Sequence, residues 1–210
     1  VTYTLRLAAL LANRIFTASK ESFRLNTKKL RIMGHGIDVD FFSPDEQISR
    51  GTAVLSAGRL SPTKRHDLVI RAAEHFPNEV RIVGEGPERY HLENLTKDLS
   101  LATRVHFLGA HTQEELREEY RRAGIFVHVS ETGSLDKVVL EALACGLPVV
   151  TTSVTLAELP VTVVAPTPKT IAEGVLAALS NDTKSLVTYV REHHSLQSLI
   201  PEILEAIQAL

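Results

Sequence analysis

The apolar and polar positions of this chain follow two alternating patterns, which predict a parallel β-sheet whose strands are connected by helices. Short apolar runs recur along the chain, and stretches with apolar residues three or four positions apart separate them. Strands that helices cover on both faces of a sheet have this continuous apolar character. The sequence therefore predicts an α/β fold with five strands, at 53–57, 80–83, 105–108, 125–129 and 148–152.

Helices are expected in the gaps between these strands and again after the last one. The predicted helices span 66–75, 87–99, 113–123, 136–145, 170–179, 184–192 and 201–210. Near the start, apolar residues from Leu5 to Phe16 follow helical spacing, and Leu30 to Met33 predicts a short strand. The expected architecture is a Rossmann-like parallel sheet with helices on both faces, plus terminal helices.

Composition narrows the class of protein further. Hydrophobic residues make up 44% of the 210 positions and charged residues 23%, which is typical of an ordinary globular protein. The formal net charge of −2 lacks the basic excess of a nucleic-acid binder. A single cysteine, Cys145, favours a reducing compartment, and no secretory or membrane-spanning pattern is found, so we expect a cytoplasmic protein.

Charge is distributed unevenly along the chain. The first 33 residues hold seven basic residues and only one acidic residue, Glu21. We interpret this segment as a solvated helix face, because its apolar positions resemble those of a core. A contact with an acidic membrane surface, at the inner face of the membrane, is the second interpretation.

Candidate chemistry lies in the loops that follow the predicted strands, because ligands of such sheets bind at the carboxyl ends of the strands. Arg59 and Lys64 follow Gly58 in the first of these loops, and two cations on one loop can hold a diphosphate. The alternative is a solvated basic loop, since Arg65 and His66 come next. Gly109 begins the loop after another of these strands.

The segment before the helix at 136–145 is the second candidate. Free amide groups at a helix start bind anions, and phosphate is the natural ligand, although an ordinary helix cap explains the same residues. The residues concerned are Gly133, Ser134, Leu135, Asp136 and Lys137.

Glu141 lies within that helix among apolar neighbours. A carboxylate there either pairs with Lys137, one turn earlier, or accepts hydrogen bonds from the two hydroxyls of a ribose. The spacing alone does not decide between the two.

Several other motifs are set aside. Gly84-Glu85-Gly86 lacks the third glycine of a dinucleotide fingerprint, and Asp38-Val39-Asp40 is interpreted as a turn. The nine histidines show no metal-ligand spacing, and we expect His106 and His128, inside predicted strands, to be hydrogen-bonded in the core.

Taken in order, these motifs resemble the carboxyl-terminal, donor-binding domain of the family 4, or group 1, retaining glycosyltransferases of the GT-B fold. The resemblance covers most of the chain. The segments that carry it are 34–38 with Phe42 and Pro44, 57–60 with Lys64, 83–87, 105–109 and 140–149.

The resemblance implies roles for the candidate residues. Arg59 and Lys64 would hold the diphosphate of a nucleotide-sugar and offset the charge on the leaving group, and Glu141 would bind the ribose. The amides of residues 134–137 would contact phosphate, and the region from Gly109 to His111 would lie near the base. Such enzymes need no metal cofactor and transfer a sugar to a hydroxyl of a glycan or lipid-linked acceptor.

Two features depart from the family pattern. Gly133 stands where the family has a first glutamate that contacts the donor sugar, and Glu131 and Asp136 are the nearby acids, Asp136 being the better placed. Residues 1–50 resemble only the end of an amino-terminal acceptor domain and a linker, with the donor domain at 51–210. We therefore expect the chain alone to bind nucleotide and transfer sugar poorly, or, as the alternative, to be a catalytically silent nucleotide-binding or assembly module.

Overall fold

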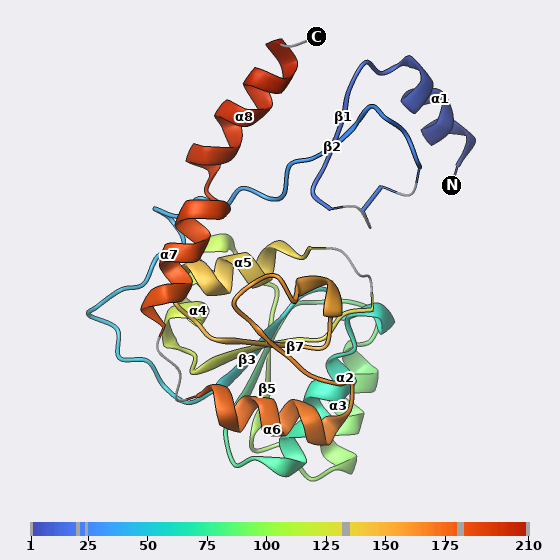
Figure 1. The fold of residues 1–210 in the computed structure, drawn as a ribbon. Helices are drawn as coiled ribbons and strands as arrows, with labels where there is room; N and C mark the ends of the chain where they lie inside the picture. The colour runs from blue at the N-terminus through green and yellow to red at the C-terminus, as the bar shows by residue number, and fades with distance from the viewer. Residues whose placement is uncertain (1, 20–21, 24, 132–134, 180–182, 209–210) are drawn as a thin grey trace.

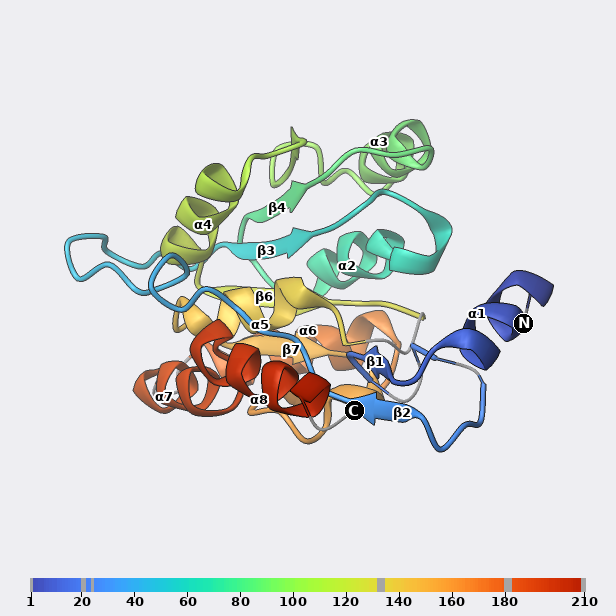
Figure 2. The same ribbon diagram turned by 90° about the horizontal axis from the view of Figure 1, so that it is seen from above.

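The fold is built on a six-stranded sheet in which every neighbouring pair of strands is parallel. The computed structural model describes residues 2–19, 22–23, 25–131, 135–179 and 183–208. The strand order is β5-β4-β3-β6-β7-β8, and Figure 2 shows four of these strands, β4, β3, β6 and β7, side by side in this order. The chain therefore builds the sheet outward in one direction from β3 and then in the other from β6.

The predicted elements are present with small differences at their ends. The strands of the sheet are β3 (Val54–Ala57), β4 (Val80–Val83), β5 (Val105–Gly109), β6 (Ile125–His128), β7 (Val149–Thr151) and β8 (Thr162–Val163). The helices that connect and follow them are α2 (His66–Ala72), α3 (Arg89–Asp98), α4 (Gln113–Arg122), α5 (Lys137–Ala144), α6 (Pro168–Ala178) and α7 (Lys184–His193). The expected α/β class is confirmed, and the short strand β8 is one that the sequence pattern did not predict.

Successive strand residues face opposite sides of the sheet and form two separate cores. Val54 packs with α2, α3 and α6, whereas its neighbour Leu55 packs with α4, α5 and α7. Figure 1 shows these two groups of helices on opposite sides of the sheet. Ile125 and Phe126 on β6 divide in the same way, and all four of these side chains are fully buried. This double burial explains why the strands are continuously apolar in sequence.

Glycines let the loops after β3 and β4 approach backbone to backbone. Gly84 has φ +141°, and a Cβ at this position would collide with the carbonyl oxygen of Gly58. A Cβ on Gly86 would collide with the carbonyl oxygen of Leu60 in the same way. The amide of Leu60 donates to the carbonyl of Glu85 at 2.9 Å, so the two loops continue the pairing of their strands. The glycine motif that resembled a nucleotide fingerprint thus shapes the loop that carries Arg59.

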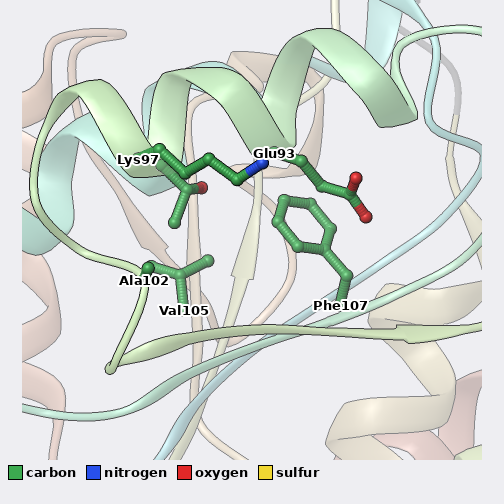
Figure 3. Close-up of a pocket in the computed structure, with 6 residues that line it drawn as sticks. Glu93, Lys97, Ala102, Val105 and Phe107 are labelled. Atoms are coloured by element: carbon green, nitrogen blue, oxygen red, sulfur yellow. The ribbon is translucent and has the colours of Figure 1, made fainter.

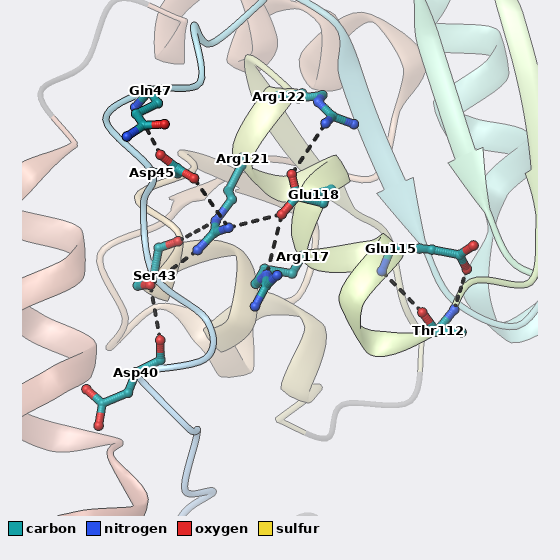
Figure 4. Close-up of polar contacts among 10 residues, drawn as sticks. All are labelled: Asp40, Ser43, Asp45, Gln47, Thr112, Glu115, Arg117, Glu118, Arg121 and Arg122. Carbon is teal, nitrogen blue, oxygen red and sulfur yellow. Dashed lines mark hydrogen bonds and ion pairs between the residues drawn. The ribbon is translucent and has the colours of Figure 1, made fainter.

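The linker before β3 is fixed onto α4 by polar contacts. Arg121 on α4 donates from Nε to the carbonyl of Ser43 at 2.8 Å and from Nη1 to Glu118 at 3.0 Å, and its Nη1 lies 3.7 Å from Asp45 (Figure 4). At the start of the same helix, Thr112 and Glu115 form a capping box. The linker therefore belongs structurally to the unit that contains the sheet.

A second, smaller group of elements lies beyond α5, away from the sheet (Figure 1). It contains α1 (Tyr3–Leu11) and the parallel strands β1 (Ile15–Thr17) and β2 (Leu30–Ile32), and α8 (Leu196–Gln208) extends in the same direction. Ile37 and Ser195 form a parallel bridge where the chain passes between the two parts. The amide of Ile37 donates to the carbonyl of His194 at 2.7 Å, and the amide of Leu196 donates to the carbonyl of Ile37 at 3.0 Å.

Two predicted boundaries at the chain ends are wrong. The helix expected through Phe16 ends at Leu11, because the β-branched run at Ile15 pairs with Leu30 in a parallel ladder. The last helix begins at Leu196 rather than at Pro201, which lies inside it. A stripe formed by Leu196, Ile200 and Leu204 carries the helical pattern through the proline.

The close approach at Gly84 generates a prediction about stability. We expect Gly84→Ala to lower the free energy of unfolding by about 3 kcal/mol, because strain at positive φ adds to the collision with the Gly58 carbonyl. Gly58→Ala is the matched control: its φ is +151°, but the nearest atom to an added Cβ lies 3.9 Å away. Urea unfolding measures both variants, and equal losses would contradict the role of the backbone contact.

Candidate functional site

The candidate site lies where the strand order reverses. β3 and β6 are neighbours, and the chain leaves their carboxyl ends toward helices on opposite faces of the sheet. In open parallel sheets this reversal leaves a crevice at the carboxyl ends of the strands, where ligands bind. The loop after β3 carries Gly58, Arg59 and Lys64, and the loop after β6 leads through Asp136 into α5. The structure thus brings the two loops singled out in the sequence to one crevice.

A chain of polar contacts connects these loops. Lys64 Nζ lies 2.5 Å from Asp136 Oδ2 and 3.5 Å from the hydroxyl of Ser130. The same carboxylate oxygen lies 2.8 Å from His128 Nε2, and His128 Nδ1 lies 3.0 Å from the hydroxyl of Thr151. Because an ionised carboxylate only accepts hydrogen bonds, His128 Nε2 is the donor in its contact with Asp136. Asp136 therefore bridges Lys64 and His128.

The charge of Asp136 is stabilised by this network. Burial alone would raise its pKa, but hydrogen bonds from His128 and Lys64 outweigh burial and lower the pKa of Asp136 to about 2. The side chains of Lys64 and Asp136 are only 22% and 18% exposed. Asp136 immediately precedes α5, but its side chain makes no capping hydrogen bond. The ordinary helix cap that the sequence left open is therefore not how this carboxylate is used.

Arg65 makes a second tie between the loops. Its Nη1 donates to Glu131 at 2.7 Å, and its Nε donates to Asp67 at 2.9 Å. The amide of Glu131 also donates to the carbonyl of Thr63 at 3.0 Å. These contacts hold the β3 loop against the β6 loop on the outer side of the Lys64–Asp136 pair.

Arg59 differs from its neighbours in having a free side chain. It is exposed, and within the described part of the chain it makes no hydrogen bond or ion pair. Its neighbour Gly58 is in close backbone contact with Gly84, so the loop that carries Arg59 is packed against the loop after β4. Gly109 at the end of β5 continues this glycine-lined edge, since its carbonyl accepts from the amide of Gly84 at 2.7 Å.

Glu141 lies on α5 in a cavity of ≈ 260 Å³. Lys137 and Gln113 line the same cavity, together with Gly36 and Phe41 from the linker region. The hydroxyl of Tyr120 donates to Glu141 Oε2 at 3.3 Å. Burial raises the pKa of Glu141 against the opposing effects of Tyr120 and Lys137. The ion pair with Lys137, one of the two sequence interpretations, is not formed among the described residues, and the carboxylate retains capacity for a ligand.

Two candidate residues, Gly133 and Ser134, lie outside the described residues, so their expected contacts remain predictions. Leu135 lines a cavity of ≈ 620 Å³, together with Ile32 and Gly34 and with Tyr189 and His194. This cavity lies between the β1–β2 part and the main sheet unit, adjacent to the start of α5. The first amides of a helix lack partners within the helix and can in general bind an anion, which keeps the start of α5 a candidate phosphate contact.

Other features of the described residues offer no comparable chemistry. A cavity of ≈ 130 Å³ between α3 and the edge strand β5 is lined mainly by apolar atoms, with Phe107 and Val105 beneath Glu93 and Lys97 (Figure 3). No group of three or more His, Cys, Asp or Glu side chains within the described ranges is arranged to hold a metal ion. None of the helices described there is long and apolar enough to cross a bilayer.

Two residues of the site, His128 and Tyr120, were not predicted from the sequence to belong to it. His128 was correctly expected to be buried and hydrogen-bonded, but its partner is Asp136, and its position at the carboxyl end of β6 was the available signal. Tyr120 on α4 contacts Glu141 from a different helix, and no local pattern indicates this. The parallel expectation for His106 is wrong, because its side chain is 44% exposed on the edge strand β5.

Comparison with known proteins assigns the chain to a family. The family model described as glycosyl transferases group 1 matches residues 39–192, and the chain belongs to this family. The chain is 40% identical over 142 residues to a D-inositol 3-phosphate glycosyltransferase of Mycobacteroides abscessus. This alignment covers 60% of this chain and 32% of that protein. The corresponding protein of Mycolicibacterium smegmatis is 30% identical over 166 residues, covering 72% and 36%. The chain thus spans about a third of the length of these curated relatives.

Solved structures show the same fold. Anabaena Alr3699/HepE in complex with UDP and glucose superposes with a TM-score of 0.86 at 19% identity, covering 100% of this chain and 68% of that one. The C-terminal domain of LpcC, a glycosyl transferase group 1 family protein of Francisella tularensis, gives a TM-score of 0.66 at 21% identity, covering 77% and 100%. At these identities the likeness concerns the fold.

The Lys64–Asp136 pair generates a prediction about pH. Because the pKa of folded Asp136 lies below its ordinary value of 3.8, the contact stabilises the fold above about pH 4 and is lost as the pH falls toward 2. We expect Asp136→Asn to lose roughly 2 kcal/mol of unfolding free energy at pH 7 and much less at pH 2.5.

Urea unfolding at several pH values measures this difference. Asp67→Asn is the matched control, since it removes one aspartate from the ion pair with Arg65, and its side chain is 28% exposed. We expect that variant to lose about 1 kcal/mol or less. A loss at Asp136 that does not change with pH would contradict the prediction.

Proposed function

We propose that residues 51–210 bind the nucleotide diphosphate-sugar donor of a family 4 retaining glycosyltransferase. Arg59 and Lys64 hold the diphosphate, and Glu141 binds the ribose. The observation that carries the proposal is the reversal of strand order between β3 and β6, with Arg59 and Lys64 on one bordering loop and the start of α5 on the other. Family membership supports the same assignment.

The donor chemistry is supported by the relatives. Alr3699/HepE was solved with UDP and glucose, and a TarM variant with a TM-score of 0.81 and 15% identity was solved with UDP. In this chain, the planar guanidinium of Arg59 suits two phosphate oxygens, and Lys64 supplies a point charge. The amides at the start of α5, including those of Lys137 and Asp136, add partial positive charge. Gly109 lies on the same edge of the sheet, near the base.

These groups also define the proposed chemistry. As the bond between the sugar and the diphosphate breaks, negative charge grows on the leaving phosphate, and positioned cations stabilise it. Arg59, Lys64 and the α5 terminus supply that charge from the protein, so we propose transfer without a metal ion. The sugar passes to a hydroxyl of a glycan or a lipid-linked acceptor. Asp136, close to Lys64, is the acid nearest to the donor sugar in this arrangement.

The acceptor half of the site is proposed to lie mostly outside this chain. Residues 1–50 form the end of an acceptor domain and a linker, and 51–210 form the donor domain. The curated relatives are about three times as long as the segment they share with this chain. The fold of a C-terminal domain covers 77% of it, which supports a carboxyl-terminal position. Because transfer needs both substrates held in reacting geometry, the chain alone binds nucleotide but transfers sugar poorly.

The exposed surface of α1 bears on where the enzyme acts in the cell. We propose that the enzyme acts in the cytoplasm, with a peripheral contact to the inner face of the membrane. The apolar side chains of Tyr3, Leu10 and Leu11 on α1 are more than 70% exposed, and Arg6 lies on the same helix. An exposed apolar surface beside basic residues is suited to an anionic lipid surface.

Arg59 provides the most direct test. We expect Arg59→Ala to weaken the binding of uridine, guanosine or adenosine diphosphosugars by at least about tenfold, because a charge-assisted contact to phosphate is lost. Its unfolding free energy should not change, since the exposed side chain of Arg59 makes no hydrogen bond or ion pair among the described residues. Calorimetric titration measures the affinity. Arg71→Ala on α2, also exposed, is the control that should bind normally, and absence of binding by the wild-type protein would overturn the proposed function.

Glu141 provides a test of ribose recognition. We expect the wild-type protein to prefer a nucleoside diphosphate over its 2′-deoxy analogue, and Glu141→Gln to reduce that preference about tenfold, since a carboxylate accepts hydroxyl hydrogen bonds more strongly than an amide. The variant should be no less stable than the wild type at pH 7, because burial raises the pKa of Glu141 and already disfavours its charge. Paired titrations measure the preference, and an unchanged ratio would contradict the assignment.

A further inference from the structure

One of the two cations on the β3 loop is already neutralised by the protein itself. Lys64 Nζ contacts Asp136 Oδ2 at 2.5 Å, and both side chains are about four-fifths buried. Arg59, five residues earlier, is exposed and unpaired within the described residues. The diphosphate-binding pair inferred above is therefore asymmetric before any ligand binds.

The carboxylate of Asp136 is held beside Lys64 by a second hydrogen bond, from His128. His128, 3% exposed, lies 2.8 Å from the same Oδ2 atom, and Thr151 fixes the other ring nitrogen of His128 at 3.0 Å. These two residues are a register pair at the ends of the adjacent strands β6 and β7, inside the buried sheet. Asp136 therefore presents its charge to Lys64 from a carboxylate that is held by a hydrogen bond from His128, which Thr151 holds in turn.

We propose that Asp136 is an internal counter-ion that occupies Lys64 in place of the donor phosphate and competes with it. The proposal rests on the proposed function, because it takes Lys64 as a diphosphate ligand. A diphosphate that binds Lys64 must displace the carboxylate or share the ammonium with it. His128 then acts as a positioning residue, since it holds Asp136 toward Lys64.

Two opposing effects of Asp136 on the affinity can be compared. Asp136 orients the Lys64 ammonium, and losing that orientation would weaken phosphate binding by a few-fold. It also places a negative charge in contact with the ammonium that would bind a ligand carrying two or more negative charges. Repulsion between the carboxylate and such a ligand in a partly buried site exceeds the value of orienting one side chain. Removing the carboxylate is therefore expected to tighten binding.

The experiment measures the affinity of two probes, UDP and inorganic pyrophosphate, for the full chain and its variants by calorimetry at low salt. We expect Asp136→Asn to bind both probes at least about tenfold more tightly than the wild type. Asp67→Asn, which removes the same charge from the neighbouring pair with Arg65, should change the affinity by less than about twofold. A gain in affinity is a result that structural damage does not produce.

A double-mutant cycle with Lys64→Gln tests the route of the effect. If Asp136 acts by occupying Lys64, Asp136→Asn should gain less than about twofold when Lys64 is absent. Asp136→Ser is a second variant, because serine is well tolerated before a helix and keeps a polar group there. Thermal unfolding confirms that each variant is folded at the titration temperature.

The outcomes separate this inference from the proposed function. If the wild type binds UDP and neither Asp136 variant binds more tightly, the inference is wrong and donor binding stands. If the Asp136 variants gain affinity for pyrophosphate, but UDP binds no better than pyrophosphate, the counter-ion is real and nucleotide recognition is wrong. An equal gain in the Lys64→Gln background, or no binding of either probe by any form, overturns the inference.

Discussion

The reversal of strand order between β3 and β6 is the constraint on which the rest of the structure depends. β3 continues to β4 and β5 on one side, whereas β6 continues to β7 and β8 on the other, so the connecting helices diverge at this point. The two loops left at the carboxyl ends meet with no helix between them. Contacts such as Lys64 to Asp136 and Arg65 to Glu131 close the remaining gap. The position of the site follows from topology, and its charge follows from the residues that these two loops happen to carry.

Most of the fold was predictable because burial on both faces leaves a clear signal in sequence. Five of the six strands of the sheet are short, largely apolar runs, and both faces are covered except on the edge strand β5, where His106 is exposed. The errors occur where a local pattern supports two structures. Ile15 and Phe16 fit a helical spacing, but a non-local pairing with residues 30–32 makes them a strand. Thr162 and Val163 form a two-residue strand, which is too short to be distinguished from a loop.

The site was predictable in its location and less so in its contacts. Arg59, Lys64 and Asp136 could be assigned to facing loops, because parallel strands end on the same edge of the sheet. The pairing of Lys64 with Asp136 joins residues 72 positions apart, and no spacing rule indicates it. The same is true of Tyr120 and Glu141, which meet between two helices. Local sequence identifies the groups that carry chemistry, whereas tertiary packing decides which of them neutralise each other.

The parallel bridge between Ile37 and Ser195 brings the entry and the exit of the sheet unit to a single point. The family match, residues 39–192, lies wholly between these two positions. Gly36 lies at this crossing, where an added Cβ would press on the side-chain ends of Leu196 and Leu199. A unit whose ends emerge together can be inserted into, or exchanged between, larger proteins without rerouting the neighbouring chain. The crossing at Ile37 and Ser195 therefore brings the two ends of this unit together in the way that tolerates domain insertion.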